Sequence, residues 1–215
     1  MEKYTSWIWG LVGVVVLVGV VWLASTEQPG GTGGLTASTT PITIADPSAL
    51  PGLQVGTAPW VPEIAHLSER MKADQLPELT MEGQVMHIHQ HLDLIVNGAA
   101  VAVPPEIGIN EKAGWLSQIH VHDTRGVIHV ESPYKAVFTL GQFFDVWGVK
   151  FTKDAIGGYV VDATHTLKVY VNGELYEGDP RLLLLAARQA ITVVYGTAAQ
   201  APASIPTTYA FKPSE

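Results

Sequence analysis

Residues 84–103 read QVMHIHQHLDLIVNGAAVAV, and this stretch decides the fold. Apolar and polar residues alternate along it up to Val96, as they do on a β-strand, where successive side chains point to opposite faces. Asn97-Gly98 follows, which is the strongest short signal for a tight turn, so residues 99–103 are predicted to return as a second strand. One face of the first strand carries apolar side chains and the other carries the histidines: Met86, Ile88, Leu92, Leu94 and Val96 against His87, His89, His91 and Asp93.

The rest of the chain predicts further short strands and short helices. Thr139-Leu140-Gly141-Gln142 matches a capping box, in which the first and fourth residues satisfy each other's backbone N–H groups, so a helix is expected to begin there. The other expected elements are strands at 116–122, 127–131, 167–171 and 191–195, and helices at 62–74 and within 179–189. We therefore predict a mostly β (α+β) domain, an antiparallel sheet or sandwich-like arrangement with two or three short helices.

Three histidines come together if the turn DTRG at residues 123–126 closes a simple hairpin. His120 then lies directly opposite His129, and directly opposed residues share one face with Cβ atoms about 4.5–5.5 Å apart. His122 lies on that same face, two residues along the strand. The three imidazoles form a triangle without any long-range contact, although a one-residue slip of the register would reverse the faces.

The histidines of the first strand cannot all bind one ion. At about 3.3 Å per residue, His87 and His91 lie roughly 13 Å apart. A single metal ion can therefore be bound either by His87 and His89 or by His89 and His91. Such a pair either completes the site of the second hairpin or builds another site.

This concentration of histidine points to a metal, because imidazole nitrogen is the commonest metal ligand in proteins and neutral histidine suits zinc and copper. Three imidazoles with an open fourth position are the arrangement of a catalytic zinc. The alternative interpretation is a solvated sheet face that binds nothing, and no catalytic residue is assigned. The predicted ligands of a divalent copper or zinc ion are His120, His122, His129, His87, His89 and His91, with Glu131 and Asp93 in the surrounding shell and Glu131 alternatively as a fourth ligand.

Residues 7–24, WIWGLVGVVVLVGVVWLA, form an uncharged apolar run. The run is about long enough to cross the hydrocarbon core of a bilayer as a helix. No Lys or Arg follows it until Arg70, which favours a cytoplasmic segment 1–6 and an extracytoplasmic remainder. The alternative is a cleaved signal peptide, but Trp22 fits poorly into an A-x-A-like cleavage site ending at Ala24. We predict a single-pass membrane anchor.

Composition divides the remaining chain and narrows its function. Residues 25–59 are rich in Gly, Ser, Thr and Pro and are predicted to be a flexible tether, followed by the β domain at 60–198 and a tail at 199–215. The chain has no cysteine, which excludes disulfides and thiolate metal sites. Its net charge of −8, with no cluster of Lys and Arg, argues against nucleic acid as a partner.

Several motifs occur in order along the chain. They are HIHQHLDLIVNGAAVAVPPEIGI at 87–109, IHVHDTRGVIHVESP at 119–133, FTLGQFFDVWGV at 138–149, LKVYVNGE at 167–174 and ITVVYG at 191–196. Together they resemble a family of uncharacterised bacterial and archaeal proteins that are secreted or membrane-anchored. The resemblance covers roughly residues 60–196. It implies that the histidine segments and the FTLGQFFDVWG helix belong to one domain, and it carries no activity.

The sequence is compatible with three functions. The first is a membrane-tethered extracytoplasmic domain that binds copper or zinc. The second is a zinc-dependent hydro-lyase or hydrolase, because a strand-borne His-x-His with a histidine on the next strand resembles the ligand arrangement of α-type carbonic anhydrases, where zinc activates water. The third is a non-catalytic surface interaction module, which failure to bind any metal would favour.

Overall fold

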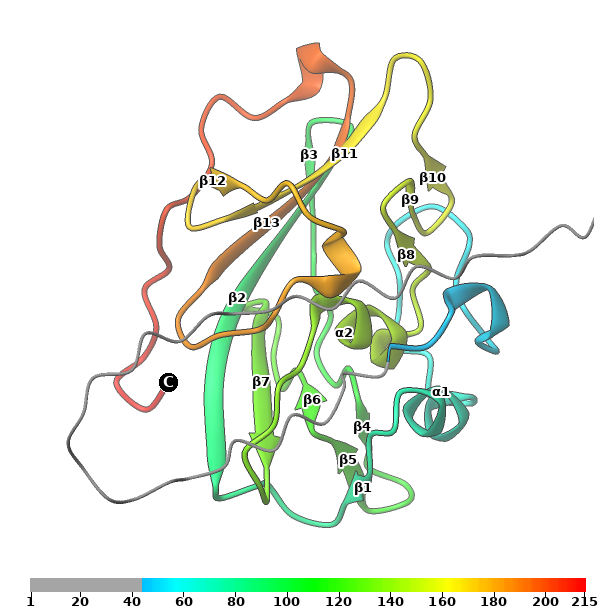
Figure 1. Cartoon of the computed structure of the whole chain (residues 1–215), viewed down its shortest axis with the longest axis vertical. Helices are drawn as coiled ribbons and strands as arrows, with labels where there is room; N and C mark the ends of the chain where they lie inside the picture. The colour runs from blue at the N-terminus through cyan, green and yellow to red at the C-terminus, as the bar shows by residue number, and fades with distance from the viewer. Residues whose placement is uncertain (1–43) are drawn as a thin grey trace, which may run out of the picture. The chain divides into compact units, whose positions relative to one another are not determined.

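The computed structural model describes residues 44–215 of the chain (Figure 1). The predicted cytoplasmic segment 1–6, the predicted anchor 7–24 and the predicted tether up to residue 43 lie outside these residues. Within residues 44–215, no helix is both long enough and apolar enough to cross a membrane.

A seven-stranded sheet forms the centre of the domain (Figure 1). It consists of β2 (Met86–Val96), β3 (Ala99–Val101), β6 (Ile119–His120), β7 (Val127–Ser132), β11 (Thr166–Val171), β12 (Glu174–Leu175) and β13 (Ala190–Gly196). The strand order is β12-β11-β13-β2-β7-β6, and β3 pairs with β2 as the Asn97-Gly98 turn predicts. β2 is the longest strand, with 11 residues, and its presence confirms the strand predicted from the alternation of apolar and polar residues.

β13 departs from the predicted antiparallel sheet because it runs parallel to β2, so the sheet is mixed. Ile191 pairs with Leu92 and Tyr195 with Val96 in this parallel register. Parallel neighbours need a long crossover connection instead of a tight turn. All of the chain between the end of β2 and the start of β13 supplies that connection, so no local pattern in the sequence signals the pairing.

Two three-stranded sheets flank the central one. They consist of β1 (Glu78–Leu79), β5 (Trp115–Ser117) and β4 (Ile109–Asn110), and of β10 (Tyr159–Val160), β9 (Ala155–Ile156) and β8 (Phe151–Thr152). The strand predicted at 116–122 is therefore divided between β5 and β6. At the division, the Gln118 side chain donates to Ser132 Oγ at 2.8 Å and the Gln118 carbonyl accepts from the Glu131 N–H at 2.8 Å. These bonds hold the chain where it passes from one sheet to the next.

The two α-helices of the described residues are α1 (Leu67–Ala73) and α2 (Leu140–Trp147). The capping box at the start of α2 is present as predicted, and all residues of this helix are buried. The helix predicted from residue 62 begins only at Leu67. Before it, the Glu63 N–H donates to the Trp147 carbonyl at 3.2 Å. The remaining helical turns are the 3-10 segments η1 (Pro47–Ala49), η2 (Pro180–Leu182) and η3 (Ala198–Gln200).

The apolar face of the central sheet and helix α2 share one core. Burial of each large apolar side chain in such a core stabilises the fold by about 1.5–3 kcal/mol. Because side chains alternate across a strand, the opposite face of β2 and β7 carries the histidines. The core includes Leu92, Leu94, Ile128, Val130, Phe143, Phe144 and Trp147.

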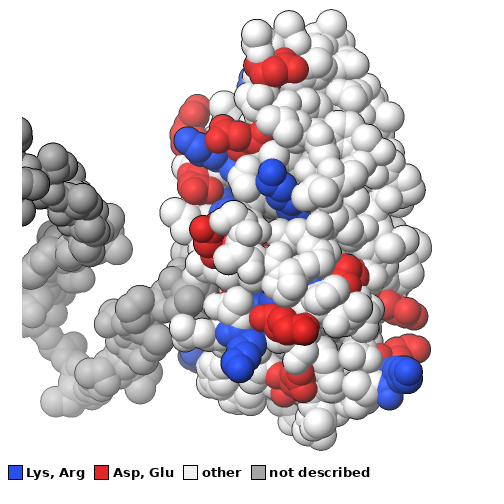
Figure 2. All heavy atoms as spheres, turned by 90° about the vertical axis from the view of Figure 1, so that its right-hand side faces the viewer, with Lys and Arg blue, Asp and Glu red and all other residues white. Residues whose placement is uncertain are grey.

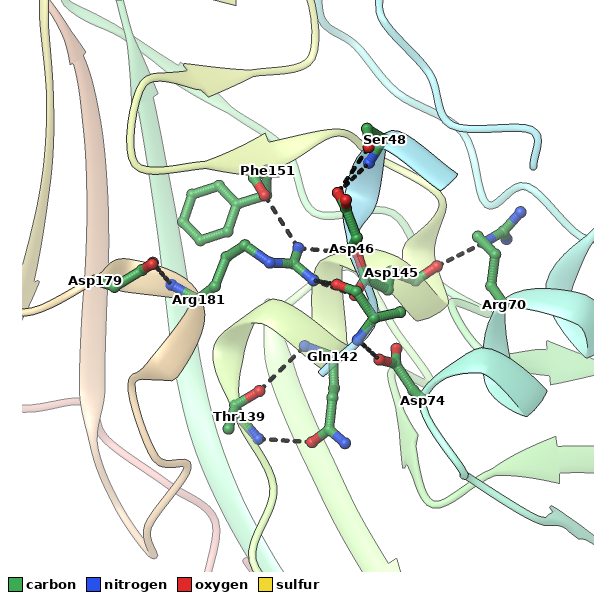
Figure 3. A network of polar contacts seen from close by, with 11 residues as sticks. Asp46, Ser48, Arg70, Asp74, Thr139, Gln142, Asp145, Phe151, Asp179 and Arg181 are labelled. Atoms are coloured by element: carbon green, nitrogen blue, oxygen red, sulfur yellow. Dashed lines mark hydrogen bonds and ion pairs between the residues drawn. The ribbon is translucent and has the colours of Figure 1, made fainter. Parts of the chain in front are cut away.

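A buried network of charges ties the N-terminal part of the domain to its helices (Figure 3). Arg181 holds the Asp145 carboxylate through two bonds of 3.0 and 2.6 Å and donates to the Ala45 carbonyl at 2.8 Å. The Ala45 N–H in turn donates to the Asp74 carboxyl at 2.7 Å. Arg70 donates to the Asp145 carbonyl at 2.6 Å. Arg181 and Asp145 thus form a buried ion pair, which compensates the cost of burying each charge.

Part of the predicted tether packs on the domain. Of residues 25–59, the structure describes 44–59, and among them Leu50 is buried. Gln54 forms a parallel β-bridge with Val149. The composition that indicates flexibility is overridden here by burial and by backbone hydrogen bonds.

The predicted tail at 199–215 also lies on the domain, and Figure 1 shows it running back past β12 and β13. The Tyr209 ring stacks on the His91 ring with centroids 3.7 Å apart. Glu215 forms an ion pair with Arg125 in which the shorter bond is 2.5 Å. The tail is therefore held on the sheet face that carries the histidines.

The charged side chains of the face seen in Figure 2 belong to both signs. Acidic and basic groups lie interspersed over that face, with no basic patch on it.

Candidate metal centre

Three adjacent strands, β2, β7 and β6, place histidines on one face of the central sheet (Figure 1). His129 on β7 lies opposite His89 on β2 and opposite His120 on β6. The predicted pairing of His120 with His129 is therefore confirmed. His122 lies just beyond the end of β6, and its ring packs edge-on against His129 with centroids 4.6 Å apart. The triangle expected from the hairpin is present.

The ring nitrogens in this cluster converge. His89 Nε2 lies 3.1 Å from His87 Nε2 and 3.1 Å from His129 Nδ1. Across the sheet, His120 Nε2 lies 3.1 Å from His122 Nε2. One proton can link only two of these nitrogens, whereas one metal ion can bind the lone pairs of three or four of them at once. The convergence of several ring nitrogens therefore favours a metal ion.

His120 is oriented by its second ring nitrogen. His120 Nδ1 lies 2.9 Å from the Ser117 carbonyl, which can only accept, so Nδ1 must donate and Nε2 is left with its lone pair. A backbone carbonyl that fixes the tautomer in this way is typical of metal-binding histidines. His120 is also completely buried. Its lone pair therefore points into the cluster and is kept from bulk water.

Burial keeps several of these rings neutral. Burial is the main cause that lowers the pKa of His120 to about 3. Burial, followed by the charges of His129 and His87, lowers the pKa of His89 to about 4. The pKa of His122 is lowered for the same main reason. Neutral imidazole is the form that binds metal, so these rings need lose no proton to accept an ion at neutral pH.

Glu131 supplies a carboxylate in the middle of the cluster. Its Oε1 lies 3.0 Å from His87 Nε2, 3.5 Å from His129 Nδ1 and 3.8 Å from His120 Nε2. Its Oε2 is buried and has no hydrogen-bond partner among residues 44–215. Burial works to raise the pKa of Glu131, but the hydrogen bond from His129 and the charges of the surrounding histidines outweigh it and lower that pKa.

The cluster opens to solvent at two histidines. The His87 side chain is 45% exposed and the His122 side chain 41% exposed, whereas Glu131 is 1% exposed. Glu82 lies at this rim, with its Oε1 3.5 Å from His122 Nε2. An ion in the cluster would therefore contact buried groups on its inner side, and solvent would reach it on the side of His87 and His122.

Two groups of side chains could hold a metal ion. In each group the ligand atoms all lie within 4.8 Å of one another. The first group consists of His120, His122, His129 and Glu131, and the second of His87, His89 and His129. Both groups contain His129, which lies on the middle strand.

His91 and Asp93 belong to neither of these two groups. His91 stacks on Tyr209, and its Nδ1 lies 3.5 Å from the Asp93 carboxylate. His91 lies on the same face of the sheet as His89, as the alternation predicts. Its ring is covered by Tyr209 of the C-terminal tail. His66 and His165 also lie elsewhere, paired with Glu63 and Asp162.

Two contributors to the site carry no signal in the sequence. Ser117 acts through its backbone carbonyl, which any residue would provide. Glu82 precedes the β2 strand in an irregular segment, and only the folded chain brings it to His122. Neither could be separated from the other serines and glutamates by spacing.

The chain was compared with protein-family models, with curated proteins and with solved structures. None of the three comparisons found a match. A function for the chain therefore rests on the chemistry of the histidine–glutamate cluster.

Proposed function

We propose that this chain is a membrane-tethered, extracytoplasmic domain that binds a copper or zinc ion in its histidine–glutamate cluster. The observation that carries the proposal is the convergence of ligand atoms from His120, His122, His129 and Glu131 within 4.8 Å of one another. Four such groups match the number and kind of ligands that zinc takes in proteins. The buried, unpartnered Glu131 Oε2 supports the same conclusion, because an unsatisfied buried oxygen is costly and an ion would satisfy it.

The donor set favours copper or zinc over other ions. Imidazole nitrogen suits zinc, copper, nickel and iron, whereas magnesium and calcium prefer an all-oxygen shell. Thiolate is absent from the whole chain, which has no cysteine. Among divalent first-row ions, copper has the highest intrinsic affinity for such a site.

The membrane tether is supported by the apolar run at residues 7–24 and by the absence of Lys and Arg between it and Arg70. Such a chain would present its metal site outside the cytoplasm. Protease treatment of intact cells tests this part: digestion of the domain without lysis is the expected result. Protection of the domain until the cells are lysed would contradict it.

The test of the metal site is elemental analysis of the full-length chain, purified in mild detergent without a histidine tag. We expect near-stoichiometric copper or zinc, retained in a His66→Ala/His165→Ala control and lost in His120→Ala/His129→Ala, which removes ligands from both groups. The control removes two histidines that lie outside the cluster. A wild-type protein that neither contains nor takes up copper or zinc would overturn the proposal.

A hydrolytic or hydro-lyase role is the second candidate, and the exposed rim favours it. An ion reached by solvent beside half-exposed His122 would carry bound water, and zinc lowers the pKa of such water to about 7. Carbonate hydration and ester hydrolysis by the zinc-loaded chain distinguish the two roles. Zinc-dependent turnover that disappears in His122→Ala would favour catalysis, and inert zinc-loaded protein would favour binding alone.

A further inference from the structure

We infer that the cluster is a two-ion centre, in which His87, His89 and His129 bind a second ion beside an ion bound by His120, His122 and Glu131. This inference rests on the proposed function, because it concerns the same cluster. It goes further in assigning the ligands to two subsites and in predicting how many ions bind. The two sets use each of the six side chains once.

The order of the strands separates the two sets. β7 lies between β2 and β6 in the sheet. Neighbouring strands are about 4.7–4.9 Å apart, so β2 and β6 are separated by about 9.5 Å. His87 and His89 extend from one outer strand, and His120 and His122 extend from the other or its end. His129 and Glu131 stand between them on β7, where each can complete the set on one side.

The first set has the spacing of a metal site. Ligands at about 2.0–2.1 Å from a tetrahedral zinc are about 3.3 Å apart from one another. His89 Nε2 lies 3.1 Å from both His87 Nε2 and His129 Nδ1, which is close to that separation. No carboxylate or backbone group is needed to complete three ligands here. Such a three-histidine site leaves a fourth position on the side of half-exposed His87.

The second set remains complete without His129. His120 Nε2 and His122 Nε2 are 3.1 Å apart, and Glu131 Oε1 lies 3.8 Å from His120 Nε2. Two histidines and one carboxylate are a common set of three protein ligands for zinc and for other transition metals. Assigning His129 to the first set therefore does not empty the second. Six donors exceed the four that a zinc ion ordinarily takes in a protein site.

Glu131 is placed to join the two ions. Its Oε1 faces His87 and His129 of the first set as well as His120 of the second. Its Oε2 is buried without a partner among the described residues. A carboxylate with two free oxygens can bridge ions about 3.5–4 Å apart, the separation seen in two-metal sites. The negative charges of Glu131 and of Glu82 at the rim offset part of the repulsion between two dications. Because some repulsion remains, the second ion is expected to bind more weakly than the first.

The experiment is a titration of the metal-free full-length chain with Cu²⁺, measured by equilibrium dialysis and by electron paramagnetic resonance. We expect two equivalents to bind. The resonance intensity per bound copper should fall as the second equivalent enters, because two adjacent Cu²⁺ ions couple magnetically. Zn²⁺ titration by calorimetry should likewise give two sequential equivalents.

Single variants at the exposed rim separate the subsites without disturbing the core. His87→Ala and His122→Ala each remove a half-exposed ligand of one set, and each should bind one Cu²⁺ tightly with undiminished resonance intensity. His165→Ala, which removes a histidine outside the cluster, should still bind two. Thermal unfolding of the metal-free variants checks that the fold is kept.

The outcomes distinguish the inference from the proposed function. One equivalent in the wild type, kept in His87→Ala and lost in His122→Ala, would overturn the two-ion centre and leave the single metal site in place. Two equivalents whose resonance intensities simply add would also overturn it, because the second ion would then lie elsewhere. Failure to bind any Cu²⁺ or Zn²⁺ would overturn both.

Discussion

His89 and His129 lie directly opposite each other on β2 and β7, and His89 Nε2 is 3.1 Å from His129 Nδ1. The two residues are 40 positions apart in the chain. Their meeting joins the histidines of the first predicted hairpin to the triangle of the second. His129 thereby contacts a histidine of each neighbouring strand, His89 on β2 and His120 on β6.

His129→Ala should weaken zinc binding more than any change at His91, although both histidines belong to the same face of the sheet. Loss of a direct ligand removes more than the 10- to 100-fold that outer-shell changes cost. We therefore expect at least about a 100-fold loss of affinity in His129→Ala and no change in His91→Ala. Competition with a chelating dye measures both. Equal losses in the two variants would contradict the placement of His91 outside the cluster.

His120 should make the metal-free protein less stable in acid. Its folded-state pKa of about 3 is below the ordinary 6.5, so the unfolded chain binds a proton first as the pH falls. Stability is then lost between pH 6.5 and about 3, at about 1.4 kcal/mol per pH unit. His120→Asn keeps a donor for the Ser117 carbonyl and does not titrate. Urea unfolding from pH 7 to pH 4 should show the wild type losing stability relative to this variant, and a pH-independent difference would refute the burial of a neutral ring.

Asp74 should act in the opposite direction. Burial, and then the charge of Asp145, raises the pKa of Asp74 to about 7 from the ordinary 3.8. The unfolded chain therefore loses this proton first as the pH rises, and stability falls between pH 3.8 and about 7. Asp74→Asn keeps the acceptor for the Ala45 N–H and cannot ionise. We expect it to be more stable than the wild type at pH 8 by about 1–3 kcal/mol and similar to it near pH 4.

The exposed Asp154→Asn provides the matched control for Asp74. Its carboxylate lies on the surface, where a change of charge has little effect on stability. Guanidinium unfolding at pH 4 and pH 8 measures both variants. A gain at pH 8 that is equally large in the control would show that net charge, and not the buried carboxyl, is responsible.

Tyr209→Ala should uncover His91 without changing metal content. The stacked rings of Tyr209 and His91 lie 3.7 Å apart and nearly parallel, at 6°. Removal of the tyrosine ring leaves the imidazole open to solvent, so diethyl pyrocarbonate should modify His91 several-fold faster, as read by mass spectrometry of the peptide. Tyr134→Ala, at an exposed tyrosine away from the tail, should leave the rate unchanged. An altered copper or zinc stoichiometry in Tyr209→Ala would show that His91 takes part in the site.

Local pattern accounts for much of this domain. Alternation along β2 determined which face carries the histidines, because successive side chains of a strand point to opposite faces. The short turn at 123–126 determined that His120 meets His129, since a tight hairpin leaves little freedom of register. The capping box determined where α2 begins, because its two hydrogen bonds involve only Thr139 and Gln142.

Contacts between distant segments were decided only by the tertiary structure. The parallel pairing of β13 with β2, the approach of His89 to His129 and the docking of Tyr209 on His91 each join parts of the chain that share no local signal. The order of strands in a sheet depends on how the whole core packs, and the spacing of residues within one hairpin does not encode it. The sequence by itself therefore determined a histidine-rich face, and the folded chain decided that five of those histidines and Glu131 meet there while His91 does not.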